Sequence, residues 1–464
     1  MAPSQFPVKD PAPSVWTASP HPLDDYQSTI ELPGQCDVLI VGSGFAGVST
    51  AYHILKDDPD PWSIVLLEAR AHCSGATGRN GGHIKPDTYY SAPKYERLYG
   101  TRQAAELQLF ESSQVWAVKE LVDREGLECD FHLTRALDVY LDPDHAAQTY
   151  EAYQRMLNDG YFDLRDVSYT GKSDAERISG VKGAQCCFSF TAAHLTPKLL
   201  VLGLLERLIN QGLQAYAHTP VVKVSPSRDS ADFWTVSTTR GDIKARKVIF
   251  ATNGYTASLL PQYHRKIVPV RGVCSHITTP NGNYSPHLPN TYSLRFGGAN
   301  YDYLIPRADG SIVVGGARQT FLHHQDRWFN SVSDNERMVP DSERYFDGYM
   351  QRHFRGWEAS GASTERVWTG VMGYTSDFMP HVGEVPTKPG QYIIAGFSGR
   401  GMPYIFLASE GLARMVRHET RYEETKLPSV LKSTRERLSS SESPLEKEFG
   451  TVWKDRAQTI PPRL

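Results

Sequence analysis

Two kinds of apolar pattern follow each other near the start of the chain and predict a βαβ unit. Residues 36–41 form a short apolar run rich in β-branched residues, which is typical of a buried strand. Apolar positions over 48–55 then recur with a helical period, and the apolar run at 62–67 predicts a second strand that ends at Glu68. Strand, helix and strand are therefore expected in close succession.

The turn between the first strand and the helix has the spacing G-x-G-x-x-G. Gly42 allows a tight turn, Gly44 lets the backbone approach a pyrophosphate, and Gly47 lets helix and strand pack closely. The helix N-terminus adds free N–H groups and a partial positive charge. Glu68 follows at the spacing of about 20 residues expected of an acid that accepts ribose hydroxyls. The unit predicts a dinucleotide site that includes Gly42, Gly44, Phe45, Ala46, Gly47 and Glu68.

Later patterns predict further elements and contain no internal repeat. An apolar helix is predicted at 199–213, and strands are predicted at 220–224, 247–250 and 392–395. Apolar alternation on both sides of an Asp-Gly pair predicts a hairpin over 303–316, because Asp-Gly is a favoured hairpin turn.

Composition and charge exclude several classes of protein. Hydrophobic residues make up 40% of the 464 residues and charged residues 22%, which excludes disorder, collagen and coiled coil. The net charge of -3 gives no general attraction to nucleic acid or to an anionic membrane. The apolar runs are too short to span a bilayer. Six scattered cysteines without a C-x-x-C pair suggest neither a disulfide framework nor a metal site, and favour a reducing, cytoplasmic compartment.

The two ends of the chain differ from the rest in composition. Residues 1–35 are rich in proline and lack a signal-peptide pattern, so they predict an extended surface arm. Trp16 either anchors this arm in an apolar groove or belongs to a flexible tail. Residues 419–464 are charged and predict a loosely packed C-terminal tail. The last tripeptide, 462–464, distantly resembles a peroxisomal signal, although its proline departs from the usual pattern; an uninformative end is the other reading.

The segment after Glu68 carries a family resemblance. Residues 75–82 read GATGRNGG, and this run resembles the superfamily of FAD-dependent D-amino-acid oxidases, glycine oxidases and sarcosine oxidases, most closely its γ-glutamylputrescine oxidase-like branch. The resemblance implies that the segment passes along FAD, whereas the alternative is a flexible linker. The cofactor contacts that we expect from this part of the chain are Ala69, Arg70, Ser74, Gly75, Ala76, Thr77, Arg79, Asn80 and Gly81.

Four later segments agree with the resemblance: 194–197 leading to 220–224, then 247–255, then 368–383, and finally 392–402. They imply further FAD contacts at Val222, Ala251, Thr252, Gly254, Gly370, Gly399, Arg400, Gly401 and Met402.

The fold implied is α/β, a Rossmann-type FAD-binding domain interleaved with an α+β substrate domain built on an antiparallel sheet. We expect the FAD-binding domain at 36–95, 191–270 and 366–418, and the substrate domain at 96–190 and 271–365.

The resemblance implies oxidation of the C–N bond of an amine, with hydride transfer to the flavin and reoxidation by oxygen to give hydrogen peroxide. His83, Lys85 and Arg271 are candidates for a positive charge that assists the oxygen reaction, and Tyr303 and Arg400 complete the catalytic candidates. Each has a structural alternative as a surface charge or a loop hydrogen bond.

Aromatic residues in the substrate segments predict either a cage for a cationic amine or ordinary core. They are Tyr89, Tyr90, Tyr301, Tyr303 and Trp328.

Two alternatives remain open for the function. One is a dehydrogenase that passes electrons to a quinone or a carrier protein, and the other is a non-catalytic FAD-binding protein. A nicotinamide-driven reductase is disfavoured because no second G-x-G-x-x-G occurs. The expected partners are a small-molecule amine and molecular oxygen, and the oligomeric state is left open.

The resemblance also bears on the flavin linkage and the substrate. Met372 and Arg79 occupy the positions where relatives attach FAD through cysteine or histidine, so FAD is expected to be held without a covalent bond. An unusual link from His83 or Cys73, neither of which aligns with those positions, is the other reading. Pro403 occupies the position of a lysine that pairs with the carboxylate in sarcosine oxidases, and Lys85 aligns only uncertainly with a second cation. A small zwitterionic amino acid is therefore disfavoured, and a polyamine derivative or a larger amine is favoured.

Overall fold

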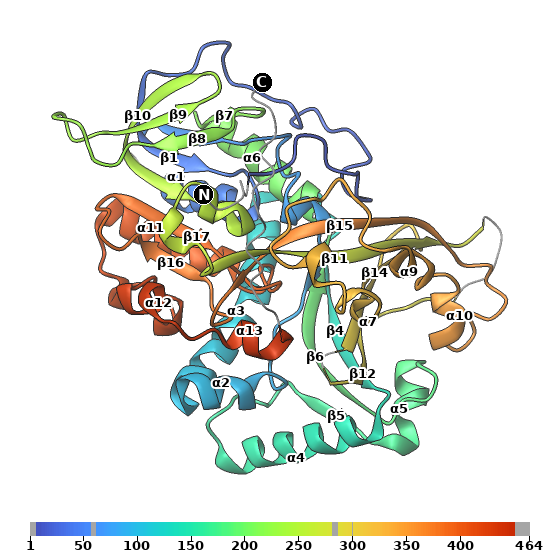
Figure 1. Ribbon diagram of the computed structural model, residues 1–464. Coiled ribbons are helices and arrows are strands. Elements are labelled where there is room, and N and C mark those ends of the chain that lie inside the picture. The colour runs from blue at the N-terminus through green and yellow to red at the C-terminus, as the bar shows by residue number, and fades with distance from the viewer. Residues whose placement is uncertain (1–5, 57–61, 281–285, 299, 451–464) are drawn as a thin grey trace.

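The computed structural model in Figure 1 describes residues 6–56, 62–280, 286–298 and 300–450. These residues form two β-sheets, one of eight strands and one of nine, with helices around them. The predicted mixed α/β architecture is confirmed. None of the helices in the described ranges is long and apolar enough to cross a bilayer.

The first sheet is the nucleotide-binding layer, and its main order is β16-β17-β10-β1-β2-β7. Strands β1, β2, β10 and β17 run parallel, so their carboxyl ends lie at one edge. The helix α1 connects β1 with β2, which confirms the predicted βαβ unit, and α6 and α11 pack against α1 (Figure 1). Bounds are β1 Gln35–Val41, α1 Phe45–Leu55, β2 Ile64–Leu67, α6 Pro197–Asn210, β7 Gln214–Tyr216, β8 Val221–Val224, β9 Trp234–Thr238, β10 Gly241–Phe250, β16 His381–Glu384, β17 Gln391–Ala395 and α11 Ile405–His418.

The second sheet has the order β15-β11-β14-β13-β12-β4-β6-β3, with β5 beside β6. Its pairs are antiparallel except β12 with β4, and the predicted hairpin is present as β13 and β14. Bounds are β3 His83–Ile84, β4 His132–Tyr140, β5 Ser168–Thr170, β6 Cys186–His194, β11 Ile267–Thr278, β12 Thr291–Gly297, β13 Asn300–Pro306, β14 Ile312–Gly316 and β15 Ser363–Thr375.

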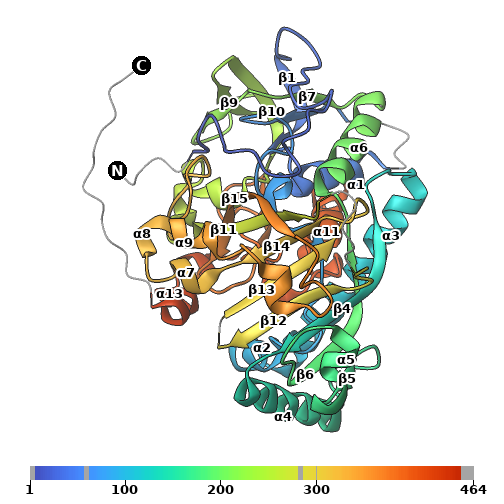
Figure 2. The same ribbon diagram turned by 90° about the vertical axis from the view of Figure 1, so that its right-hand side faces the viewer.

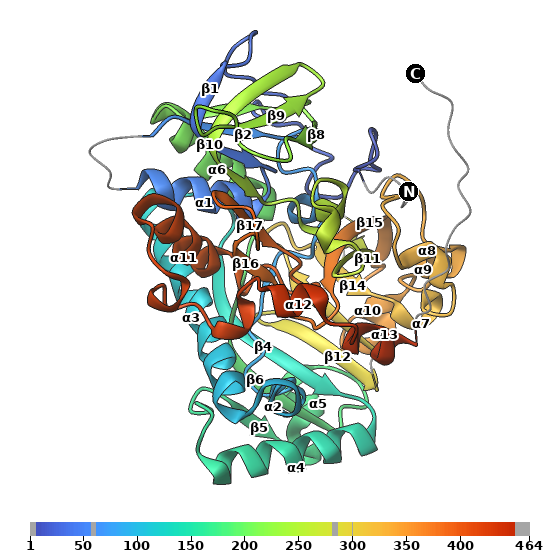
Figure 3. The ribbon, with the colours of Figure 1, turned by 60° about the vertical axis from the view of Figure 1, so that its left-hand side comes forward.

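Helices connect and cover the two sheets. The long helix α3 contacts both α11 and β6 and so ties the layers together, as Figures 2 and 3 show from two sides. Helices α4 and α5 lie at the far end of the second sheet (Figure 1). Bounds are α2 Ala92–Tyr99, α3 Thr101–Glu125, α4 Pro143–Asp159, α5 Lys172–Ser179, α7 Arg318–Phe321, α8 Gln325–Trp328, α9 Pro340–Arg344, α10 Tyr349–His353, α12 Arg435–Ser439 and α13 Pro444–Phe449.

Sheet membership differs in places from the domain boundaries expected from the sequence. Residues 83–84, 191–194, 267–270 and 366–375 were expected in the FAD-binding domain, yet they pair within the second sheet. The segment around 368–375, in which the resemblance implied an FAD contact at Gly370, is part of the long strand β15. Apolar alternation identifies a strand but does not specify the sheet it joins, which is why these boundaries shifted.

The described parts of the two terminal segments, residues 6–35 and 419–450, pack against the body of the protein. Trp16 is only 4% exposed and packs with Ile305, Val313 and Trp368, so it anchors the N-terminal arm as one reading predicted. The loose C-terminal tail was wrong for residues 419–450. Leu431 and Leu445 are buried there. A few apolar side chains are thus enough to pack this segment against the protein, although most of its residues are charged or polar. The tripeptide 462–464 lies outside the described residues.

Candidate active site

A cavity of about 820 Å³ lies between the two sheets. Its wall includes Gly42 and Gly44 at the carboxyl end of β1, and Arg295 and Tyr303 on the second sheet. Ligand pockets commonly have volumes of roughly 300–1,000 Å³, so this one is at the large end of the range. A single space thus joins the predicted dinucleotide site to the predicted substrate side.

Close contacts of the backbone explain why glycines occupy the turn between β1 and α1, at the dinucleotide side of the cavity. Gly42 has a φ of +108°, and a Cβ there would lie 2.7 Å from the Ala251 carbonyl oxygen. A Cβ at Gly47 would lie 1.9 Å from the Gly42 carbonyl oxygen. At Gly44 a Cβ would lie 3.1 Å from Thr77 Oγ1, which accepts a hydrogen bond from the Phe45 N–H. The N-terminus of α1 therefore faces the cavity with only small groups in front of it.

Glu68 is held at the end of β2 by hydrogen bonds to both carboxylate oxygens. Ser43 donates its N–H and Oγ–H to Oε2 at 3.0 and 3.1 Å, and the Arg70 N–H donates to Oε1 at 3.1 Å. A carboxylate has about four acceptor positions, so one remains for a bound hydroxyl. Glu68 also lines the cavity, where it can serve the ribose function predicted for it.

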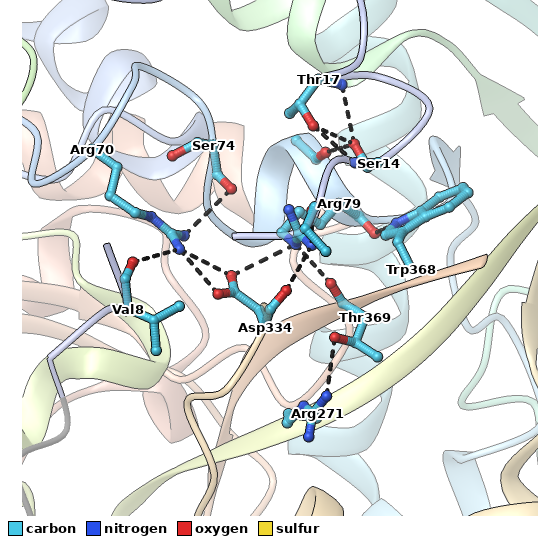
Figure 4. A network of polar contacts seen from close by, with 12 residues as sticks. Val8, Ser14, Thr17, Arg70, Ser74, Arg79, Arg271, Asp334, Trp368 and Thr369 are labelled. Atoms are coloured by element: carbon cyan, nitrogen blue, oxygen red, sulfur yellow. Dashed lines mark hydrogen bonds and ion pairs between the residues drawn. The ribbon is translucent and has the colours of Figure 1, made fainter. Parts of the chain in front are cut away.

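Arg70 and Arg79 meet at the fully buried Asp334, as Figure 4 shows. Arg70 Nη1 donates to both Asp334 carboxylate oxygens at 3.1 Å, and Arg79 Nε lies 3.6 Å from Oδ2. Arg79 also donates to the carbonyl oxygens of Thr369 and Ala12, so it joins β15 to the N-terminal arm. No local pattern indicated Asp334, because it lies more than 250 residues from its partners along the chain.

On the second sheet, two cations clamp one buried carboxylate. Lys85 Nζ lies 2.9 Å from Asp138 Oδ1, and Arg295 Nη2 lies 2.9 Å from Oδ2. Burial alone would raise the pKa of Asp138, but these two ion pairs outweigh it and lower that pKa below its usual range. Asp138 therefore stays ionised and neutralises much of the charge of Lys85 and Arg295.

Arg295 was missed by the sequence analysis, although a single arginine in the apolar strand β12 was a usable signal. Its guanidinium carbon lies 3.5 Å from the centroid of the Tyr90 ring and 5.7 Å from that of Tyr301. The aromatic candidates named above all line the cavity. The Arg295 guanidinium already covers part of the Tyr90 and Tyr301 rings. A substrate cation therefore finds less open aromatic surface here than in a cage without a bound arginine.

The predicted catalytic candidates all line the cavity, but they are engaged in different contacts. His83 Nε2 lies 2.7 Å from Thr291 Oγ1; burial, and then Lys85, lower the pKa of His83 well below its usual value, so the imidazole is neutral. Arg271 donates to the carbonyl oxygens of Arg327 and Glu336, and burial lowers its pKa to about 10.

The other two candidates also have protein partners. The Tyr303 hydroxyl lies 3.3 Å from Cys274 Sγ, and its ring occupies the space that a Cβ at Gly81 would need. Arg400 forms an ion pair of 2.5 Å with Glu111. Both contacts hold the side chains at the cavity wall.

Comparison with known proteins identifies the family. The family model described as "DAO: FAD dependent oxidoreductase" matches residues 37–415. The chain belongs to the DAO family. It is therefore an FAD-dependent oxidoreductase with FAD as its cofactor, as the resemblance had implied.

Similarity to individual proteins extends over most of the chain. Gamma-glutamylputrescine oxidoreductase of Escherichia coli K12 is 24% identical over 393 residues, covering 82% of this chain and 84% of that protein. Glycine oxidase of Bacillus licheniformis is 20% identical over 394 residues, covering 82% and 92%. The solved glycine oxidase of Geobacillus kaustophilus has the same fold, with a TM-score of 0.70, 17% identity, and coverage of 87% of this chain and 99% of that one.

Most residues predicted to contact FAD line the cavity of this DAO family member. They are Gly42, Gly44, Phe45, Ala46, Glu68, Ala69, Arg70, Gly75, Ala76, Thr77, Arg79, Asn80, Gly81, Ala251, Thr252, Gly370, Gly399, Arg400, Gly401 and Met402. Val221 lines it in place of Val222, whose side chain is 45% exposed. Gly47 and Gly254 instead pack backbone against backbone. Residues without a sequence signal also contribute, among them Glu448 and Phe449 of the C-terminal segment.

The chemistry of the wall fits FAD. Arg79 Nη1 in the wall, and Ser74 Oγ in the residue before the lining residue Gly75, are buried without a hydrogen-bond partner in the described part of the chain, although buried polar groups are normally paired. An anionic pyrophosphate offers acceptors to such donors, and the N-terminus of α1 favours the same charge. Glu68 lines the cavity with an acceptor position that can serve a ribose hydroxyl, and the glycines leave room for the pyrophosphate beside α1.

Proposed function

We propose that this enzyme oxidises the C–N bond of a small-molecule amine with molecular oxygen as the electron acceptor, giving an imine and hydrogen peroxide. The observation that carries the proposal is the single cavity that joins the residues fitted to FAD with a chamber of aromatic and charged side chains. The names of the curated relatives, a gamma-glutamylputrescine oxidoreductase and a glycine oxidase, support a nitrogen-containing substrate.

The protein's part in this reaction is to bind, orient and shield the substrate. Bound FAD supplies the acceptor for a hydride. The parts of Tyr90 and Tyr301 that Arg295 leaves open give the chamber apolar surface that holds an amine in one orientation and excludes water. His83 is neutral, so it adds no charge that would repel a protonated amine entering the site.

The N-terminal end of α11 contributes a partial positive charge to the part of the cavity fitted to FAD. Residues 399–403 line the cavity and lead directly into α11. The partial positive charge at the beginning of a helix stabilises negative charge that develops nearby during reduction. Arg400 belongs to the same segment, but Glu111 neutralises it, so the backbone rather than this guanidinium is proposed to supply the field.

An amine screen under anaerobic conditions, followed by mixing with air, tests the proposal. The expected result is that at least one amine bleaches the flavin absorbance and that air restores it rapidly with release of peroxide. Bleaching without rapid reoxidation would point to a dehydrogenase that uses a quinone or a carrier protein. If no amine of the screen bleaches the flavin, a non-catalytic FAD-binding role replaces the proposal.

We also propose a cytoplasmic location. All six cysteines are free and buried, which suits a reducing compartment. Cell fractionation followed by immunodetection checks this, and a peroxisomal fraction would support the alternative reading of the last tripeptide.

A further inference from the structure

Arg318 differs from most of the other cations in the cavity wall. Those cations are neutralised by carboxylates or bound by carbonyl oxygens: Lys85 and Arg295 by Asp138, Arg70 and Arg79 by Asp334, Arg400 by Glu111, Lys94 by Glu448, and Arg271 by carbonyl oxygens. Within the described ranges, the Arg318 guanidinium has neither a carboxylate partner nor a hydrogen-bond acceptor, and it is only partly exposed. Arg97 also lacks such a partner there, but its side chain is exposed to solvent.

Aromatic rings surround the Arg318 guanidinium. Its carbon lies 5.6 Å from the centroid of the Tyr301 ring and 5.0 Å from that of Phe449. The Phe449 ring in turn lies 5.6 Å from Trp328 and 6.2 Å from Tyr374. Ring contacts stabilise a guanidinium but do not use its N–H groups as hydrogen bonds do. The N–H groups of Arg318 are thus only partly exposed to solvent and remain available for a ligand.

The C-terminal segment contributes one of the two rings beside Arg318. Phe449 ends α13, whose Leu445 is buried and donates its N–H to the Ser376 carbonyl oxygen at 3.0 Å. The family match ends at residue 415, so α13 lies beyond it. Phe449, one of the two rings beside Arg318, therefore lies outside the segment that the family model matches, whereas Tyr301 lies inside it. Figure 1 shows α13 beside α7, which begins with Arg318.

We propose that Arg318, enclosed by Tyr301 and Phe449, binds an anionic group of the substrate, and that this group is a carboxylate several atoms away from the reacting nitrogen. A guanidinium fork matches a carboxylate with two parallel hydrogen bonds. The alternative cations Lys85 and Arg295 already share Asp138, and Pro403 offers no charge beside Met402. Glu448 is the nearby acid that could compete for Arg318, but Lys94 pairs with it.

This inference rests on the proposed amine oxidation and is tested with ω-amino acids whose chain lengthens by one methylene at a time. Each acid is compared with its neutral amide, using the FAD-loaded full-length enzyme. We expect the acids to be preferred, with an optimum at one chain length. For Arg318→Gln we expect the KM of the best acid to rise about tenfold to a hundredfold, with little change for the amide. Arg318→Lys is expected to recover part of the preference, because it keeps the charge but loses the fork.

Arg97→Gln is the matched control, since it removes one exposed positive charge from the same cavity wall. It is expected to change acid and amide kinetics equally and only slightly. Equal effects of Arg318→Gln on acid and amide, or a wild-type enzyme indifferent to the carboxylate, would overturn the inference.

A binding measurement separates this inference from the proposed function. Hexanoate and hexanamide, which cannot be oxidised at nitrogen, are titrated into the oxidised holoenzyme while the flavin spectrum and the heat of binding are followed. Hexanoate binding that Arg318→Gln weakens at least tenfold supports the subsite even if no amine is turned over. Equal binding of the two probes contradicts it. If Arg318→Gln fails to retain FAD, the comparison of acid and amide in the wild type and in Arg318→Lys decides.

Discussion

Glu68 is positioned before any nucleotide contacts it, because Ser43 and the Arg70 N–H already fix its carboxylate. We therefore expect Glu68→Ala to weaken FAD binding by about 1.5–3 kcal/mol for each charge-assisted hydrogen bond lost. Gel filtration after dilution, with FAD measured by absorbance, checks this. Ser43→Ala is a useful comparison, since it removes one positioning hydrogen bond and should weaken binding less. Full FAD retention by Glu68→Ala would contradict the ribose role.

The side chains at the positions where relatives attach the flavin do not favour a covalent link. Met372 lines the cavity but has no thiol, and Arg79 is engaged with Asp334 and backbone carbonyl oxygens. Cys73 is fully buried, and burial raises the pKa of its thiol far above the usual value, so it is a poor nucleophile. After acid precipitation, we expect yellow colour in the supernatant. A yellow pellet, with the protein mass raised by one FAD, would refute non-covalent binding.

Pro403 leads to a prediction about small substrates. It lines the cavity beside Met402 and has no charge for a carboxylate next to the reacting nitrogen. We therefore expect sarcosine, glycine and proline to be turned over with a kcat/KM at least about a hundredfold below that of the best amine, the cost of a lost charge-assisted pair. Steady-state peroxide assays measure the ratio. Efficient turnover of sarcosine would disprove this expectation.

At the scale of elements, the N-terminal arm supports the FAD-binding segment. Trp16 is buried against Ile305 and Trp368, and its Nε1–H donates to the Asn80 carbonyl oxygen at 2.6 Å. Ser14 Oγ–H donates to the Gly78 carbonyl oxygen at 2.5 Å. Since the arm fixes the backbone of this segment, we expect Trp16→Ala to lose about 3–5 kcal/mol of stability and to retain FAD poorly. Urea unfolding and FAD content measure the two effects.

Trp116 offers a matched control for that substitution. It lies on α3 with 54% of its surface exposed, so Trp116→Ala should change stability by less than about 0.5 kcal/mol. If the two tryptophan variants behaved alike, the arm would have no supporting role.

At the scale of the whole molecule, buried neutral histidines make stability depend on pH. Burial lowers the pKa of His53 to about 3 and those of His194 and His353 to about 4. In the unfolded chain histidine binds a proton near pH 6.5, so acid favours unfolding. Each histidine then removes up to about 1.4 kcal/mol per pH unit between about pH 6.5 and pH 4. Asp302, whose pKa burial raises to about 6, works in the opposite direction and offsets part of this loss.

Urea unfolding of the holoenzyme at several pH values checks the expected loss. Stability should fall from pH 7 to pH 5, and His194→Gln should show a shallower fall than the wild type because one titrating group is gone. A pH-independent free energy of unfolding over this range would contradict the assignment of neutral buried histidines.

Local patterns were sufficient for the βαβ unit and for most of the predicted residues that line the cavity. The glycines of 42–47, the strand end at Glu68 and the run at 75–81 are short-range signals, since each depends on neighbours close in the sequence. The hairpin of β13 and β14 was predictable for the same reason, because an Asp-Gly turn fixes the pairing of its flanking residues.

Contacts between distant parts of the chain could not be derived in this way. Asp334 pairs with Arg70 across 264 residues, and Asp138 pairs with Arg295 across 157. The sequence has many acids, and no local pattern selects the two that become buried partners. Sheet membership could not be derived either, because the sheet that β15 joins depends on which strands lie beside it.

The sequence by itself thus determined the βαβ unit, the glycines at the cavity wall and the family, because these depend on backbone geometry encoded within short segments. Only the tertiary structure decided the charge state of the cavity wall, since a cation is neutralised or left available by whichever acid folding brings beside it. The same holds for the enclosure of Arg318, to which α13 contributes from the far end of the chain.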